Sequence, residues 1–266
     1  MILVCLTTLA FSKVYYARVE PYEVRDITAQ VSGEVLSADK DMLGKILSSK
    51  PFVVVDDELD RDELISVQEK LEYFRDTLKT NEKILVNLKD ALKRKKENFK
   101  RIESLSIKSK VEKDREFYDL IGSQNSYLAT LKEMNSLKTS ISDLRFREKQ
   151  LKKTIADKSV AAKGFVLYAL KVKEGSVVQP GTPLATVADV HKAVVTIYLD
   201  SDDLLDIDKK HIYINGHKSA YRLTRILKIA DTKNISRYSA QIIMKRPKIF
   251  SQMVKIELKE DSNEEK

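Results

Sequence analysis

An apolar residue recurs at every seventh position through the middle of the chain. This spacing predicts one face of a long helix that packs against a partner helix, and a second apolar row lies three residues after members of the first. The rows require a helix of about 45 residues, which is about 65 to 70 Å long. Asn81 and Lys95 interrupt the second row and are typical of polar positions that set register. The first row is Leu64, Leu71, Leu78, Leu85, Leu92 and Phe99, and the second contains Val67, Phe74, Leu88 and Ile102.

A second apolar series follows and predicts another helix of similar length. It contains one short step, between Leu131 and Leu137, which resembles a stammer in a coiled coil. There is no proline between Pro51 and Pro180, so no proline interrupts either predicted helix. The second series is Phe117, Ile121, Leu128, Leu131, Met134, Leu137, Ile141, Leu144, Leu151 and Ile155.

A Ser-rich segment, residues 104–109, separates the two series. Ser109 with Glu112 fits a capping box that begins the second helix. We therefore expect residues 58–157 to form an antiparallel coiled-coil hairpin with its tip at 104–112. Two helices of a compact bundle are the alternative, but such helices bury a wider stripe, and the remaining faces here are dense in Lys, Glu and Asp.

Short alternating runs on both sides of the hairpin predict β-strands separated by tight turns at glycines. The runs that flank the hairpin are 27–35, 52–55, 164–170, 175–181 and 183–187. Beyond His191, five more short strands predict a small barrel or sandwich. These strands are expected at 193–199, 212–214, 223–229, 239–244 and 253–258.

The charge of the chain is concentrated in one stretch. Of 266 residues, 48 are Lys or Arg and 40 are Asp or Glu, and residues 70–110 hold 13 of the basic and 6 of the acidic residues. This stretch lacks interleaved aromatic residues that stack on bases, so nucleic acid is not expected as a partner. With 7 Gly, 5 Pro and 1 Cys, the chain is not a collagen, a disulfide scaffold or a Cys-ligated metal domain.

Side chains that carry most enzymatic chemistry are scarce. The three histidines are His191, His211 and His217. His211 and His217 are six residues apart with no third ligand in evidence, so no metal site is expected. The carboxylates follow helix surfaces and form no catalytic dyad. We expect neither an enzyme nor a bound cofactor.

The first twelve residues are largely apolar but are too few to span a membrane, which needs about twenty. Ala10 and Ser12 are small residues at the positions that signal peptidase requires. Cleavage before Lys13 would produce an exported protein. A buried first strand is the alternative for this segment. Cys5 follows Val4 and is not expected to carry a lipid.

The glycine-rich block at 162–189 strongly resembles half of a biotinyl/lipoyl domain, because Gly164, Gly175 and Gly181 and a following Pro-Leu step have that family's spacing. Residues 31–59 resemble the partner half, with Gly33 in its first strand. Gly44 stands where the family has a Glu-Gly turn. The whole hairpin separates the halves.

A split lipoyl domain with an inserted coiled coil and a following barrel resembles the periplasmic adaptor subunits, or membrane fusion proteins, of tripartite efflux pumps. The resemblance implies an α+β fold, with a split lipoyl-like β-sandwich, an inserted antiparallel hairpin and a small β-barrel. The implied divisions are 1–12 signal peptide, 13–23 N-terminal strand joining the barrel or a reduced membrane-proximal region, 24–57 first lipoyl half, 58–157 hairpin, 158–190 second lipoyl half, 191–260 barrel and 261–266 disordered tail.

The hairpin tip resembles the channel-docking motif of adaptors. Arg101 and Leu105 keep the family's four-residue spacing, and Ser109 with Asp114 resembles the following Ser and acid, although the gap from Leu to Ser is three residues shorter here. The resemblance implies that these residues contact a TolC-type outer-membrane channel. The alternative is that Leu105 and Ser109 only close the loop while Arg101 is solvated.

The resemblance implies a non-enzymatic periplasmic adaptor that forms a homo-oligomeric ring, a trimer or hexamer, and joins an inner-membrane transporter to the channel. Membrane association would come through these partners. A resistance-nodulation-division pump is expected as the transporter, with an ABC-type exporter as the alternative. A swinging-arm carrier would need an acceptor lysine at the turn between the halves, where neither Lys40 nor Lys158 lies. A cytoplasmic coiled-coil scaffold would leave the glycine blocks unexplained.

Overall fold

The computed structural model describes residues 13–205, 207–230 and 237–260. The expected signal peptide, 1–12, and the expected tail, 261–266, lie outside the described residues. The chain divides into two compact units, of which one is the segment Val55–Ser159 and the other contains the residues before and after it.

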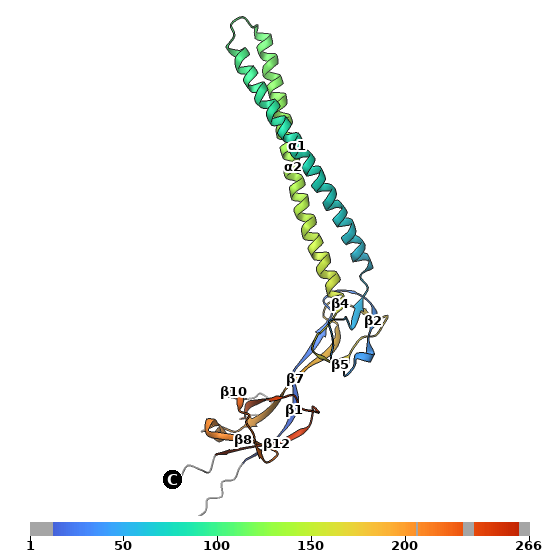
Figure 1. The fold of residues 1–266 in the computed structure, drawn as a ribbon, viewed down its shortest axis with the longest axis vertical. Coiled ribbons are helices and arrows are strands. Elements are labelled where there is room, and N and C mark those ends of the chain that lie inside the picture. Colours follow the sequence, from blue (N-terminus) through green and yellow to red (C-terminus); the bar gives the residue numbers. More distant parts are fainter. Residues whose placement is uncertain (1–12, 206, 231–236, 261–266) are drawn as a thin grey trace, which may run out of the picture. The chain divides into compact units, whose positions relative to one another are not determined.

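The first unit is the predicted hairpin. Helices α1 (Glu58–Ser104) and α2 (Lys110–Asp157) run antiparallel and side by side, as Figure 1 shows. Leu105, in extended conformation, caps the end of α1, and Ser109 caps the start of α2 with the expected capping box. The local signals of the sequence therefore set where the helices end and begin.

The second unit contains a lipoyl-like part built from both sides of the hairpin. Its four-stranded sheet has the order β4-β3-β2-β6, formed by Ser159–Val160, Val53–Val55, Gly33–Ala38 and Val177–Val178. A short 3-10 helix, η1 (Lys40–Met42), precedes Gly44. Gly44 has a positive φ of 76° and donates its N–H to the Leu167 carbonyl at 2.9 Å. Gly44 thus lies in a turn conformation that suits glycine.

The glycines of the second half occupy the turns expected of them. Gly175 and Gly181 have φ values of 80° and 91°, which favour glycine. Their N–H groups donate to the carbonyls of Val35 and Ala29 at 2.9 and 2.8 Å. Gly164 has φ 88°, and Gly33 pairs with Val178 at the start of β2. The two halves of the lipoyl-like part are therefore joined through backbone hydrogen bonds at these turns.

A larger eight-stranded sheet forms the rest of the unit, in the order β10-β11-β7-β1-β12-β8-β9, with β5 also paired to β7. Alternate residues of β7, such as Val195 and Ile197, are buried together with Ile242 and Ile256. Among the described strands β10 and β9 remain unpaired edges, so the expected barrel is a half-barrel. The strands are β1 Val14–Thr28, β5 Val166–Leu170, β7 Pro183–Leu199, β8 Lys210–Ile214, β9 His217–Lys218, β10 Leu223–Ala230, β11 Tyr238–Lys245 and β12 Met253–Glu260.

Two strands are longer than the sequence predicted. β1 pairs with β12 through its first five residues and with β7 through the rest, and β7 pairs with β1, β5 and β11 along its length. The expected divisions at 23/24 and 190/191 fall inside β1 and β7. The predicted strand 27–35 is instead two segments, because Ala29 leaves β1 and exchanges backbone hydrogen bonds with Gly181 and Thr182. The predicted α+β fold class, with its inserted hairpin, is confirmed.

Candidate docking tip of the helical hairpin

The hairpin is best packed in the half that lies away from its tip. Leu71 is 2% exposed and packs with Val67, Ile141 and Leu151, and the side chains of Leu64, Phe74, Leu78 and Leu144 surround this cluster. The remaining members of the seven-residue row, Leu85, Leu92 and Phe99, are half-buried. All six row residues thus lie on the covered side of α1.

Packing changes toward the tip. Among the residues of α1 and α2, all of which the structure describes, none between 82 and 133 is buried. Phe117 stacks on Phe99 at 5.7 Å between ring centres but stays 44% exposed, and Leu128 is also exposed. The tip half of the seam therefore buries less apolar surface than the other half.

The short step between Leu131 and Leu137 does not interrupt α2. α2 is one uninterrupted helix, and its more covered residues continue in steps of three and four. Near the tip, polar residues such as Ser123 and Thr130 take the covered positions, and the apolar residues Phe117 and Leu128 lie beside them. A continuous contact between two helices keeps an average step of 3.5 residues, so only some members of the apolar series near the tip, such as Ile121 and Leu131, are half-buried.

Asn81 is buried in the middle of the seam, with 7% of its surface exposed. Its Nδ2 has no hydrogen-bond partner. The contacts Gln68–Glu148 and Lys95–Asp119 define the antiparallel register, which brings Asn81 to the level of the buried Met134. A buried amide donor without a hydrogen-bond partner lowers stability. Asn81 therefore marks the boundary between the well-packed half and the tip half.

Charges are distributed unequally along each helix. α1 holds seven acidic and three basic residues over 58–78, but four acidic and nine basic residues over 79–104. α2 holds five acidic and four basic residues over 110–134, and three acidic and six basic residues over 135–157. The acidic half of α1 therefore lies beside the basic half of α2, and the basic half of α1 lies beside the slightly acidic half of α2.

Ion pairs between the helices follow this distribution. Arg147 donates two hydrogen bonds to Glu63, each 2.7 Å long, and Lys95 contacts Asp119 at 2.7 Å. Lys158 pairs with Asp60 at the end away from the tip. All but the last are exposed, so they contribute to the register of the hairpin more than to its stability.

The tip presents Arg101 and Leu105 to solvent. Arg101 lies in the last turn of α1, where its positive charge complements the helix dipole. Leu105 is 42% exposed at the C-cap. Within the described part of the chain, neither Arg101 nor Asp114 forms an ion pair. Both residues are exposed on the helix surface, so their charged groups can meet another molecule.

Ser109 is in a different situation because its hydroxyl is already engaged. It donates to Glu112 Oε2 at 3.0 Å and accepts the Glu112 N–H at 3.3 Å, while the Ser109 N–H donates to the same carboxylate at 3.0 Å. Lys108 pairs with Glu112 at 3.0 Å. Lys108 first, and then the Ser109 hydrogen bonds, lower the pKa of Glu112 to about 2. The capping box thus fixes the start of α2. It also engages the Ser109 hydroxyl, which the sequence predicted to dock, in hydrogen bonds within the tip.

Two apolar tip residues were not singled out by the sequence reasoning. Ile107 is 87% exposed in the link between the helices, and Val111 is 78% exposed in the first turn of α2. A hollow of about 400 Å³ lies on the side of the tip, lined by Ile102, Lys108, Glu112, Arg115, Glu116 and Asp119. The sequence did contain a signal for Ile107: an isoleucine in a short Ser-rich link has no core nearby to be buried in, so it is expected to be exposed. Ile107, Leu105 and Val111 make the tip an apolar knob with cations around it.

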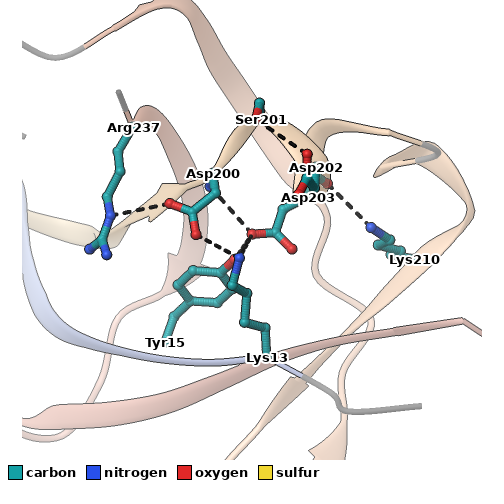
Figure 2. A network of polar contacts seen from close by, with 8 residues as sticks. All are labelled: Lys13, Tyr15, Asp200, Ser201, Asp202, Asp203, Lys210 and Arg237. Atoms are coloured by element: carbon teal, nitrogen blue, oxygen red, sulfur yellow. Dashed lines mark hydrogen bonds and ion pairs between the residues drawn. The ribbon is translucent and has the colours of Figure 1, made fainter. Parts of the chain in front are cut away.

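A second polar cluster lies at one end of the half-barrel (Figure 2). Lys13 contacts Asp200 at 2.6 Å and Asp203 at 3.0 Å, the Tyr15 hydroxyl donates to Asp203, and Arg237 contacts Asp200 at 3.2 Å. Burial raises the pKa of Asp203, but the hydrogen bonds from Tyr15 and Lys13 outweigh it and lower the pKa overall. Burial and then Asp203 raise the pKa of Tyr15. These contacts join the start of β1 to the 3-10 helix η2 (Ser201–Leu204) and its N-cap Asp200, which in turn pairs with Arg237 just before β11.

Neither long helix, nor any other helix within the described ranges, is long and apolar enough to cross a membrane. No family profile and no curated protein sequence matches the chain. Several solved structures do match the chain in fold. MacA from Actinobacillus actinomycetemcomitans is 17% identical with a TM-score of 0.64, over 93% of this chain and 78% of that one.

Two further structures have the same fold. The membrane fusion protein Spr0693 from Streptococcus pneumoniae R6 is 10% identical with a TM-score of 0.58, over 94% of this chain and all of that one. A MacA-MexA chimera that contains the Pseudomonas aeruginosa MexA α-hairpin domain is 15% identical with a TM-score of 0.58, over 93% and 81% of the two chains. The chain therefore has the fold of the membrane fusion proteins, as the resemblance of its sequence implied.

Proposed function

We propose that this chain is a periplasmic adaptor that links an inner-membrane transporter to a TolC-type outer-membrane channel. The observation that carries the proposal is the hairpin tip, where Leu105, Ile107 and Val111 are exposed and Arg101 forms no ion pair with any described residue. An apolar knob with an adjacent cation suits a groove between helices of another protein. Arg101 and Leu105 form the docking pair, with Ile107 as a third contact.

Ser109 and Asp114 have unequal roles in this proposal. The Ser109 hydroxyl is held by Glu112, so Ser109 acts by shaping the tip. Asp114 is exposed on the next turn and is able to meet a cation of the channel. No catalytic group, metal or cofactor is part of the proposed role.

We further propose that copies of the chain assemble into a ring, a trimer or hexamer, in which α1 of one copy lies against α2 of the next. The charge distribution supports this arrangement. Between neighbours related by rotation, the acidic half of α1 would again face the basic half of α2. Exposed apolar residues on the outer faces, including Tyr73, Val86 and Tyr118, would be covered by the neighbour.

Site-specific crosslinking in cells tests the docking role. Arg101→Cys, Leu105→Cys and Ile107→Cys are made in a Cys5→Ser background, and Lys149→Cys on the other half of α2 is the matched exposed control. Adducts with an outer-membrane protein are expected from the tip variants and not from Lys149→Cys. Absence of tip adducts from a chain that fractionates with the cytoplasm would favour the coiled-coil scaffold instead.

The same cells identify the transporter. Purification of the crosslinked complex is expected to recover an inner-membrane protein, and its class decides between a resistance-nodulation-division pump and an ABC-type exporter. Native mass spectrometry of the purified chain measures the stoichiometry, for which a multiple of three is expected. A strictly monomeric chain at all concentrations would contradict the ring.

A further inference from the structure

A cavity of about 660 Å³ lies at the open side of the half-barrel. One wall comes from β8 and β9, which form one edge of the sheet, and the other comes from β10, at the opposite edge. The loop between β9 and β10, residues 219–222, completes the lining. The volume is within the range of about 300 to 1,000 Å³ that is typical of small-molecule sites.

The floor of this cavity is apolar. Ile212 is 2% exposed and belongs to the half-barrel core, and Ile207, Leu223 and Ile226 pack against that core from the cavity side. Tyr221 also lines the cavity, and its hydroxyl is held by the Lys245 N–H at 3.3 Å. The hydrophobic surface is thus fixed to rigid elements, and an aliphatic group placed on it would leave water.

The rim of the cavity is cationic. Lys210, Lys218 and Arg222 line it, against the single carboxylate of Asp208. Lys210 donates to the Asp203 carbonyl at 3.3 Å (Figure 2), a long contact that leaves donors of the ammonium for another acceptor. Among the described residues Arg222 has no hydrogen bond or ion pair, and its guanidinium fork suits a carboxylate or phosphate. Lys218 and His211 each already have an interaction partner, so Lys210 and Arg222 are the cations assigned to a ligand.

We propose that this cavity binds an anionic amphiphile, with its head group between Lys210 and Arg222 and its aliphatic part on Ile207, Leu223 and Ile226. A small inorganic anion would leave the apolar floor uncovered, and a neutral hydrocarbon would give no acceptor to Arg222 or to the remaining donors of Lys210. An anionic amphiphile satisfies both surfaces. The site does not depend on the adaptor function, because every residue that forms it belongs to the half-barrel.

The test uses the purified full chain and the fluorescent fatty acid cis-parinarate, with competitors kept below their micelle concentrations. Laurate and dodecyl phosphate are expected to displace the probe with one-to-one stoichiometry, and the better of the two identifies a carboxylate or a phosphate head group. Dodecyl maltoside, which has the same chain and no charge, is expected to be about tenfold weaker because it lacks the charge-assisted hydrogen bonds. Displacement by inorganic phosphate alone, or equal displacement by the maltoside, would overturn the proposal.

Variants locate the site. Lys210→Gln and Arg222→Gln are each expected to weaken cis-parinarate binding about tenfold, and Ala220→Trp, which fills the cavity from an exposed position, is expected to abolish it. Arg225→Gln, three residues after Arg222 on β10 and outside the lining of this cavity, is the matched control and should bind as the unaltered chain does. Circular dichroism checks that each variant is folded. Equal losses in Arg222→Gln and Arg225→Gln would show that the cavity is not the site.

Discussion

The two halves of the hairpin differ in how well the residues at their heptad positions are buried. Away from the tip, Leu71 and its neighbours are buried against α2, and the helices hold each other by apolar contact. Toward the tip, Ser123, Thr130 and Lys95 take covered positions, and Phe117, Leu128 and Val111 remain exposed. Asn81 separates the halves. The first half provides stability, whereas the second half leaves apolar surface and positive charge exposed.

The largest effect should come from removing an apolar contact in the well-packed half. Leu71→Ala is expected to lower the free energy of unfolding of the hairpin by about 3 kcal/mol, because the buried leucine leaves a cavity. Leu92→Ala, at the half-buried position three heptads further along, should cost only about 1 kcal/mol. Urea denaturation of both variants measures the difference. Equal losses would mean that the tip half is packed as well as the other.

Asn81 offers a change in the opposite direction. Asn81→Leu is expected to raise the free energy of unfolding by about 1 to 2 kcal/mol, since it replaces an unpartnered buried amide with an apolar side chain. Its control is Asn87→Leu, at an exposed position six residues nearer the tip, which should change stability little. A destabilised Asn81→Leu variant would show that the amide has a favourable role in the seam.

The capping box should matter only locally. Ser109→Ala removes the side-chain cap of α2 and is expected to cost about 1 kcal/mol. The loss should appear as faster amide hydrogen exchange in the first turn of α2, at Val111 to Lys113, and not near Leu151. Ser106→Ala, in the same link and outside the cap, is the control. Faster exchange throughout α2 would contradict a local role.

The same box predicts a pH dependence of the tip. The pKa of Glu112 is lowered from 4.5 to about 2, so its contribution is complete above its ordinary pKa and is lost as the pH falls through about 2. Nuclear magnetic resonance of the Ser109 amide should therefore report an intact cap at pH 4 that opens near pH 2. A midpoint near 4.5 would show that Lys108 and Ser109 do not stabilise the carboxylate.

The smallest effect is expected from the exposed pair of Glu63 and Arg147. Arg147→Gln should lower the thermal midpoint slightly at low salt, and the difference should vanish at high salt because exposed charges are screened. Arg145→Gln, an exposed arginine on the same helix without that pairing, is the control. A large effect that persists at high salt would mean that the pair holds the helices together.

The heptad rows of α1 and the capping box of α2 could be predicted because both depend on residues that are close in sequence. The phase of α2 near the tip could not, because its apolar series alone predicts a covered position at Leu128, which is exposed, whereas the polar residues Ser123 and Thr130 are half-buried. Arg101 and Leu105 were predicted at the tip. Ile107 was missed, and the engagement of the Ser109 hydroxyl depends on where Glu112 points its carboxylate.

The sequence by itself determined the α+β organisation, the two helices, their caps and the glycine turns, because periodicity, capping and left-handed backbone preferences are local properties. Only the tertiary structure decided that β1 and β7 are continuous, that the sheet stays open between β9 and β10, and that a cationic cavity forms there. Strand length, edges and cavities depend on which distant segments pair. For example, Val19 of β1 pairs with Val195 of β7, and Leu199 at the other end of β7 pairs with Tyr238 of β11. The alternation of apolar and polar residues along one strand does not specify which other strand it pairs with.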